Sequence, residues 1–291
     1  RVTRLKASDN YPKRCIQLMR NFLLILITLV LFNCSYQEQG RESFIKPQLI
    51  DDSILLKKSG VYFEKQSISY TQPLFVGKFS FQEKTIFINV DSIVLNRDNP
   101  ENTYFEAYHQ IKANTDSISS NGLKLIFDTD QELNLNFIYF DSLTYKYFPI
   151  YIINNTSSPK AFDGKDFHSF GIQEAIDSSY YKENPPWYPI SSKGVPWCGS
   201  GNWNLKLNPK EYIVILMPIF KGNTKTLLRS RIQINNSIFV SAPYKGSINL
   251  EQFISKDTFL FNLKDKNKII RYQNSFLGAT PKEFSRHFNK P

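Results

Sequence analysis

The sequence predicts an all-β protein, a β-sandwich that follows an N-terminal signal or anchor helix. Phe (24) and Tyr (16) are abundant in the 291 residues, whereas Gly (12) and Met (2) are few, and aromatic and β-branched side chains suit a half-buried pleated surface. Many short apolar stretches are separated by turn signals, while helical periodicity is weak outside residues 172–180 and 250–254. With 41% hydrophobic and 21% charged residues, the chain is not of the wholly disordered class.

The first expected element is the apolar run at residues 22–32, which follows Met19, Arg20 and Asn21. Its eleven residues would span about 16 Å as a helix, whereas a bilayer core needs about 20 apolar residues. A basic start, a short apolar stretch and a polar zone after it are typical of a secretory signal peptide. We therefore assign residues 19–33 to the signal peptide, and residues 1–18 to upstream sequence or an extended n-region outside the fold.

The end of this run carries a resemblance. Leu31-Phe32-Asn33-Cys34 resembles the lipobox of bacterial lipoproteins, in its relaxed form because Phe32 and Asn33 are bulkier than usual. The resemblance implies that Cys34 is lipidated and becomes the first residue of the mature protein, which would be an outer-membrane lipoprotein of the bacterial cell envelope. The membrane is then a partner through Cys34, the leaflet stays open, and residues 34–60 are the lipidated cysteine and a polar tether.

Positive charge is concentrated at the two ends of the chain. Residues 1–33 hold six basic and one acidic side chain, so the net charge falls from +10 to +5 without them, and residues 256–291 hold eight basic against three acidic. The part between is balanced, which excludes the broad basic face of a nucleic-acid-binding protein. The basic C-terminal segment 256–291 is either a solvated end or a contact to acidic lipid or polysaccharide.

Strand-like segments follow one another along the rest of the chain. Pro149 lies inside one of them and predicts an edge position or a bulge, and Asn-rich turn signals stand at residues 154–156, 208–211 and 235–237. The expected strands are 85–95, 123–127, 133–139, 145–153, 203–207, 212–220, 229–234 and 238–242.

One of these turns resembles a corner found in a large family of sandwiches. The run Leu207-Asn208-Pro209-Lys210-Glu211-Tyr212-Ile213-Val214 is similar to the corner of fibronectin type III and immunoglobulin-like domains, where the Tyr hydroxyl bonds back to the corner. The resemblance implies an immunoglobulin-like β-sandwich and no particular activity. We expect a β-rich region at 61–140 and a β-sandwich domain at 141–255, although one continuous domain fits the pattern equally.

All three tryptophans, Trp187, Trp197 and Trp203, fall within residues 184–203 among several Pro and Gly residues. Such a segment is expected to be a long ordered loop, and loops of this length are often functional. The indoles would then stack on sugar rings and bind polysaccharide, or insert into another envelope protein. The alternative is that they cap the core, because indole rings are mostly buried for packing.

The residues that could support catalysis form no coherent set. Cys198 with His168, beside Asp163 and Asp166, is a candidate for a thiol hydrolase. Cys198 would be the one thiol left in the processed and lipidated protein, and a free cysteine is better explained by burial as a small hydrophobic residue. The acids Asp128, Asp130 and Glu132 fit turns as well as glycoside or calcium chemistry. No spacing fits zinc or a phosphate loop, so we expect no enzyme, no metal and no cofactor.

A recurrent Asp-Ser-aliphatic tripeptide resembles the O-glycosylation signal of exported proteins in one Gram-negative phylum. The serines concerned are Ser53, Ser92, Ser117 and Ser142. The same tripeptide also suits turns that lead into strands. The sequence as a whole predicts a non-enzymatic, lipid-anchored envelope protein, with a carbohydrate-binding lipoprotein as the alternative and a Cys/His hydrolase as the weakest reading.

Overall fold

The structure, a computed structural model, describes residues 43–51, 62, 73–88, 120–136, 144–165, 168–177, 183–193, 202–253 and 274–282. The chain divides into two compact units, Arg1–Ser43 and Phe44–Pro291. The expected signal peptide and Cys34 belong to the first unit and lie outside the described residues. All the elements below belong to the second.

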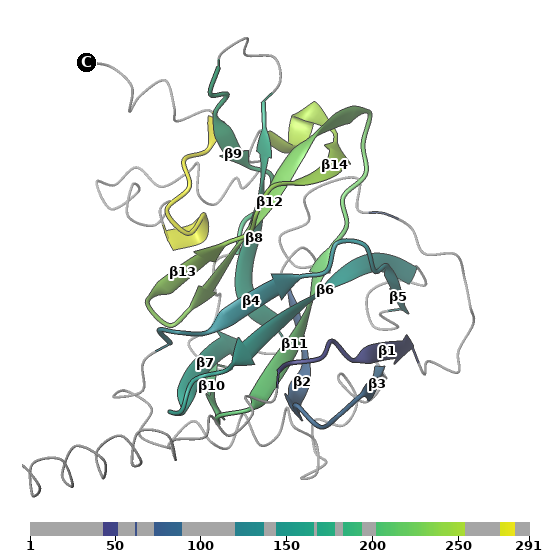
Figure 1. Cartoon of the computed structure of the whole chain (residues 1–291). Helices are drawn as coiled ribbons and strands as arrows, with labels where there is room; N and C mark the ends of the chain where they lie inside the picture. Colours follow the sequence, from purple (N-terminus) through teal and green to yellow (C-terminus); the bar gives the residue numbers. More distant parts are fainter. Residues whose placement is uncertain are drawn as a thin grey trace, which may run out of the picture. The chain divides into compact units, whose positions relative to one another are not determined.

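The elements confirm the all-β prediction (Figure 1). The named elements are β1 (Gln48–Asp51), β2 (Leu74–Ser80), β3 (Thr85–Ile88), β4 (Lys124–Phe127), β5 (Leu133–Asn136), β6 (Thr144–Asn154), β7 (Lys160–Lys165), β8 (His168–Ile176), β9 (Trp187–Pro189), β10 (Asn202–Leu207), β11 (Glu211–Pro218), β12 (Thr224–Ile234), β13 (Ser237–Val240), β14 (Tyr244–Ile248) and the short 3-10 helix η2 (Leu250–Phe253).

A large antiparallel sheet organises the unit. Its main path runs β10-β7-β8-β2-β11-β6-β4, β5 also pairs with β6, and β9 and β12 pair with β8. Strand β12 in turn pairs with β13 and β14, while β1 and β3 form a separate parallel pair. Because β2, β4 and β5 pair with β11 or β6, strands from 61–140 and 141–255 share one sheet.

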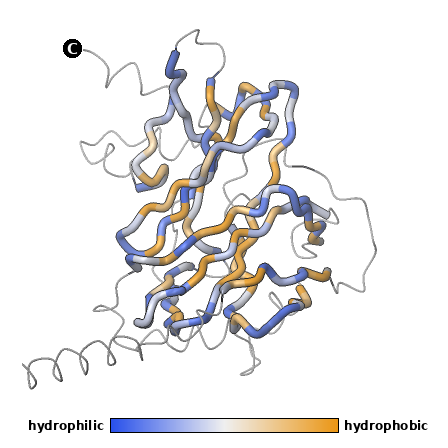
Figure 2. The backbone as a smooth tube through the Cα atoms, viewed as in Figure 1, coloured by the Kyte–Doolittle hydropathy of each residue, from blue (hydrophilic) through white to orange (hydrophobic). Residues whose placement is uncertain are grey.

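Strands β6 and β11 pair with each other, and each has a further neighbour in the sheet. Most of their residues are buried, on both faces, and Figure 2 shows the hydropathy along the chain. On one face, Tyr151 and Val214 pack under the β1–β3 pair. On the other face, Ile150 and Ile213 meet side chains from β7, β10 and β12. Successive residues of a strand point to opposite faces, so this alternation gives two cores and a sandwich-like arrangement.

Of the two positions predicted for Pro149, the edge is wrong, because β6 is paired on both sides, but the residue does lie opposite an irregularity in the neighbouring ladder. The residue pairs with Leu216 of β11, and its carbonyl accepts the N–H of Asp128 at 3.0 Å on the other side. The N–H and C=O of one strand residue point the same way, so the side on which proline lacks an N–H is the side of Asp128. On that side β4 ends opposite Ile150 and β5 begins opposite Tyr147, which leaves a break opposite Pro149. The proline therefore removes no ladder bond.

Two further expectations have clear outcomes. The helical periodicity at 172–180 was misleading, because Ile172 to Ile176 belong to strand β8, which is buried on both faces. The Tyr212 hydroxyl was expected to bond back to the corner at 207–211, but it donates to the carbonyl of Glu83 at 3.4 Å, and β11, in which it lies, is buried on both faces and does not alternate. That contact ties β11 to the turn between β2 and β3.

The buried tyrosines predict a loss of stability in alkali. Burial raises the pKa of Tyr151, Tyr212 and Tyr244 above its ordinary value of 10.0. The unfolded chain releases these protons at lower pH than the folded chain, so the free energy of unfolding is undiminished below about pH 10 and falls above it. Each tyrosine contributes a slope of up to about 1.4 kcal/mol per pH unit, measurable as the urea midpoint from pH 9 to 11.

Tyr151→Phe is the matched variant for this slope. Among the described residues the Tyr151 hydroxyl has no hydrogen-bond partner, so the substitution keeps the ring and removes only a titrating group. We expect a shallower fall above pH 10 and equal or higher stability at pH 7, because an unsatisfied buried hydroxyl is costly. An unchanged slope would mean that Tyr151 does not titrate between the two states.

Candidate functional site

One face of the sheet formed by β8, β9 and β12 holds the densest charged cluster of the described residues. Arg229 stands directly opposite Glu174 in the β12–β8 ladder, and Glu174 stands opposite Pro189 in the β8–β9 ladder. Directly paired residues share a face, as do residues two apart along a strand. The register therefore brings Arg231 and Trp187 to the same face as Glu174 and Arg229.

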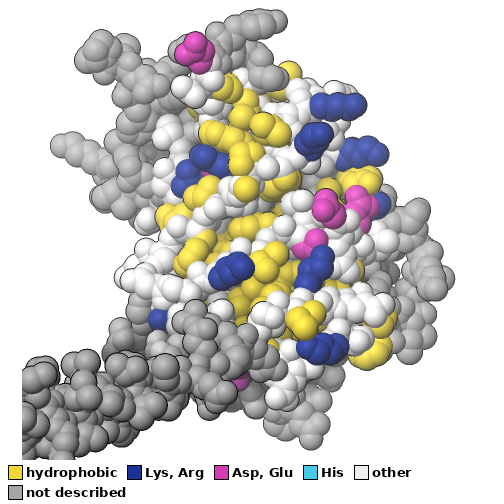
Figure 3. Space-filling view, viewed as in Figure 1, with side chains coloured by type: hydrophobic (Ala, Val, Ile, Leu, Met, Phe, Trp, Pro, Cys, Tyr) yellow, Lys and Arg dark blue, Asp and Glu magenta, His cyan; other side chains and the backbone are white. Residues whose placement is uncertain are grey.

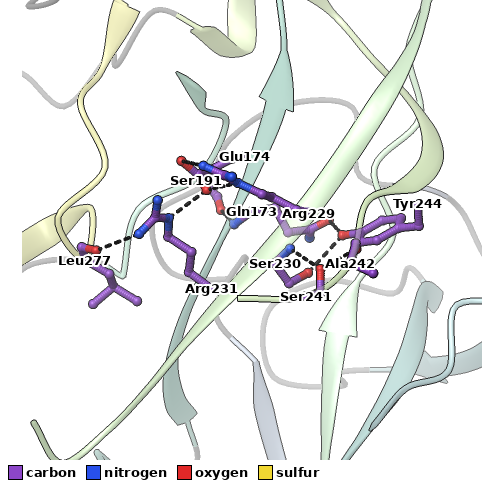
Figure 4. A network of polar contacts seen from close by, with 10 residues as sticks. All are labelled: Gln173, Glu174, Ser191, Arg229, Ser230, Arg231, Ser241, Ala242, Tyr244 and Leu277. Carbon is purple, nitrogen blue, oxygen red and sulfur yellow. Dashed lines mark hydrogen bonds and ion pairs between the residues drawn. The ribbon is translucent and has the colours of Figure 1, made fainter. Parts of the chain in front are cut away.

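Glu174 is the centre of this cluster (Figure 4). Its side chain is only 1% exposed, and its Oε2 accepts hydrogen bonds from the Nε of Arg229 and the Nε of Arg231, each at 2.6 Å. The Nη2 of Arg229 also donates to Oε1 at 3.2 Å. One carboxylate thus holds two guanidinium groups, and the cluster keeps one net positive charge.

Each arginine makes a second contact. The guanidinium of Arg229 lies 4.4 Å from the centre of the Trp187 ring, a cation–π contact. Arg231 donates from Nη1 to the carbonyl of Leu277 at 3.4 Å, and the N–H of Lys193 donates to the carbonyl of Ser275 at 2.9 Å. The segment at 274–282 is therefore packed on the sheet, with Leu277 buried. This part of the basic C-terminal segment is not a solvated end.

The opposite face of the same strands carries a chain of neutral polar groups (Figure 4). Buried Gln173 donates to the carbonyl of Pro218 at 2.7 Å and accepts from the Tyr244 hydroxyl at 2.8 Å. Ser230 lies 2.9 Å from that hydroxyl, and its N–H donates to the Oγ of Ser241 at 2.9 Å. Every group here is satisfied by a neighbour, which is the arrangement of a structural network.

Comparison with family models, curated proteins and solved structures finds no match.

A second pair of charges lies at the end of β7. Burial raises the pKa of the Asp163 carboxyl, while the N–H of Asn235, which donates to its Oδ1, lowers it. Burial also lowers the pKa of Lys193, and the charge of Asp163 acts in the opposite direction. The Lys193 Nζ donates to Gln233 at 3.1 Å and lies 5.0 Å from the Phe170 ring centre. The Asp163 carboxylate is thus held by a backbone N–H and the Lys193 ammonium by a side-chain amide, so both groups have hydrogen-bond partners within the sheet.

Trp203 does not belong to the expected platform. Trp203 is 1% exposed and packs against Phe75 and Phe162, with ring centres 5.0 and 5.7 Å away. It offers no face to a ligand, because indole stacking needs an accessible ring. Trp187 lies in strand β9, where a loop was expected, and is half-buried under Arg229. Trp197 lies outside the described residues.

The catalytic candidates are only partly placed. His168 begins β8 opposite Leu74 and Lys165, whereas Cys198 and Asp166 lie outside the described residues. Of the acids expected at turns, Asp128 pairs with Lys46 at 2.7 Å and Glu132 pairs with Lys146 at 2.5 Å. Their carboxylates hold the ends of β4 and β5 against neighbouring segments.

The candidate lipidation and glycosylation sites lie outside the part of the chain that the structure describes. Cys34, Ser53, Ser92, Ser117 and Ser142 lie outside the described residues. Within the described ranges, no three His, Cys, Asp or Glu side chains gather as a metal site would need. Nor does any helix in these ranges have the length and hydropathy to cross a membrane.

The Glu174 cluster was missed by sequence reasoning, although a signal existed. Arg229 and Arg231 alternate with buried residues of β12, and an Arg-x-Arg pattern in a strand puts both guanidiniums on one face. What the sequence did not indicate was the pairing of β12 with β8, which supplies the carboxylate. Chemically, the cluster holds three strands together and leaves a cationic, partly apolar surface.

Proposed function

We propose that this chain is a lipid-anchored protein of the bacterial cell envelope, attached to the outer membrane through Cys34. The apolar run at 22–32 followed by Cys34 supports this proposal, because a short apolar stretch suits export rather than a stable span. Two acyl chains on one cysteine give stable anchoring, since each buried methylene contributes about 0.8 kcal/mol. The all-β unit from Phe44 onward would then lie outside the membrane.

We infer that the anchored unit acts as a non-enzymatic binding or structural module. The observation that supports this most strongly is the saturation of its charged cluster, in which both Nε atoms at 2.6 Å are directed at one buried carboxylate. A general acid or base must reach a substrate proton, whereas Glu174 faces two arginines. The carbohydrate alternative loses Trp203, which is buried, and Cys198 of the hydrolase alternative lies outside the described residues.

Intact mass of the protein purified from a Gram-negative membrane tests the anchor. We expect a chain that begins at Cys34 and carries acyl groups, and hexose-type increments would support glycosylation at Ser53, Ser92, Ser117 or Ser142. The Cys34→Ser variant should lose the acyl mass and leave residues 1–33 attached. Mass is the deciding measurement, because an uncleaved apolar run can itself retain a protein at the membrane.

Cys15→Ser is the matched control for this experiment. It removes a thiol upstream of the expected cleavage site, so the mass of the mature protein should be identical to that of the wild type. An unmodified chain that still contains the residues before Met19 would overturn the anchor. In that case Cys34 would be an ordinary thiol.

A further inference from the structure

Within the part of the chain that the structure describes, strand β13 is paired on one side and has an edge on the other. The strand pairs with β12 through Arg231–Val240, Ile232–Phe239, Gln233–Ile238 and Ile234–Ser237. Among the described residues, no other strand pairs with it. Figure 1 shows β13 at the margin of the sheet that it forms with β12 and β8.

The register tells which groups of β13 point outward. The N–H of Ser241 donates to the carbonyl of Ser230 at 2.9 Å, so these two residues form a hydrogen-bonded pair of the ladder. Hydrogen-bonded and non-hydrogen-bonded pairs alternate in an antiparallel ladder, so Ile238 and Val240 are in non-hydrogen-bonded pairs. Their N–H and C=O groups therefore point away from β12, toward the open side.

The same two residues expose large apolar side chains. Ile238 and Val240 are each 45% exposed, whereas Phe239 between them packs into the core. Figure 3 shows hydrophobic and basic side chains next to one another over one face of the described residues. An edge strand with exposed β-branched residues and free main-chain groups is a template for pairing with another strand.

The neighbouring part of this edge is protected, which makes β13 stand out. Strand β14 continues the pairing with β12, but the ladder passes from Arg231–Val240 to Leu228–Tyr244, so three residues oppose two and form a bulge. The bulge contains Pro243, and Lys245 follows it. Bulges, proline and lysine are the features that prevent strand addition. Strand β13, Ser-Ile-Phe-Val, has none of them.

We propose that β13 pairs antiparallel with β13 of a second copy of this chain. A two-fold axis through Phe239 sets Ile238 opposite Val240 of the second copy, and Val240 opposite its Ile238. Each such pair exchanges two hydrogen bonds, so every outward N–H and C=O of both residues is used. Their side chains come within about 5 Å of each other and cover the apolar surface. Any other register leaves some of these groups unpaired.

Sedimentation equilibrium of the full chain, in a detergent matched in density to the solvent, tests this dimer. The interface is shorter than a standard one, so we expect a dissociation constant on the order of 10–100 µM. Val240→Pro should weaken the association at least tenfold. It deletes an outward N–H while the ladder to β12 keeps its bonds, and proline is tolerated at a strand edge.

Charged substitutions at positions 238 and 240 provide a second test, in which two variants that do not dimerise alone should associate with each other. Lysine at both 238 and 240 sets like charges opposite each other across the two-fold axis and should abolish the dimer. Glutamate at both positions should do the same, and a mixture of the two variants should form a heterodimer. Leu227→Lys is the matched control, because Leu227 is 41% exposed on β12, away from the open edge, and should leave the association unchanged.

The outcomes separate the possible occupants of the edge. A wild type that stays monomeric up to 300 µM would overturn self-pairing and leave the edge to a strand of another protein. A dimer that persists in Val240→Pro and in the double lysine variant would place the contact elsewhere. Circular dichroism and urea midpoints equal to those of the wild type show that each variant is folded, so neither outcome is ambiguous.

Discussion

Glu174→Gln is expected to lower the free energy of unfolding by about 3 kcal/mol, since removing one partner of a buried ion pair costs about 3–5 kcal/mol. The side chain of Glu174 is 1% exposed, and those of Arg229 and Arg231 are 22% and 19% exposed. Glutamine keeps the shape of the side chain but leaves two guanidiniums without their counter-charge. The partial exposure of the arginines puts the loss at the lower end of the range. Urea unfolding of the full chain at pH 7 measures it.

The specificity of this effect is checked with an exposed pair and a double variant. Glu132→Gln removes the partner of Lys146 where the carboxylate side chain is 43% exposed, and should cost less than about 1 kcal/mol. Arg229→Leu should cost less in the Glu174→Gln background than in the wild type, because the two residues interact directly. Equal losses in Glu174→Gln and Glu132→Gln would show that the cluster does not fasten β8 to β12.

The all-β class could be predicted from the composition and from the alternation of apolar and polar residues. Which strands pair with which could not be predicted. The hairpin at 229–242 was expected from its turn signal and is present as β12 and β13. The continuation of β12 back to Thr224, paired with β14 beyond a bulge, was not expected, because the predicted hairpin covered only residues 229–242. The edge position predicted for Pro149 is wrong for a similar reason, since the break between β4 and β5 that accommodates the proline lies in other segments.

The candidate site shows the same limit in side-chain terms. The carboxylate that binds Arg229 and Arg231 is that of Glu174 in β8, more than fifty residues earlier in the chain. A carboxylate in a strand has no local pattern that distinguishes a solvated position from a buried one. Only the ladder between β8 and β12 decides that Glu174 is buried between two arginines. By contrast, the burial of Trp203 could have been predicted locally, because it lies on the same face of its strand as Leu205 and Leu207, and both of these are buried.

Trp203→Ala is expected to cost about 3–5 kcal/mol, the range for removing a large aromatic side chain from a core. The ring fills the space between Phe75 and Phe162. It also lies directly over Gly164, where a Cβ atom would come within 2.3 Å of the ring. The close fit leaves no room for neighbours to fill the cavity without moving β7. The urea midpoint of the full chain at pH 7 measures the loss.

Trp187→Ala is the matched control, because it removes the same side chain from a half-buried position. There the main loss is the contact with Arg229, and about 1 kcal/mol is expected for a cation–π contact of this kind. A large loss at 203 with a small loss at 187 assigns Trp203 to the core. A Trp203→Ala variant with wild-type stability would mean that the ring does not pack between Phe75 and Phe162, and would return Trp203 to the surface as a candidate ligand contact.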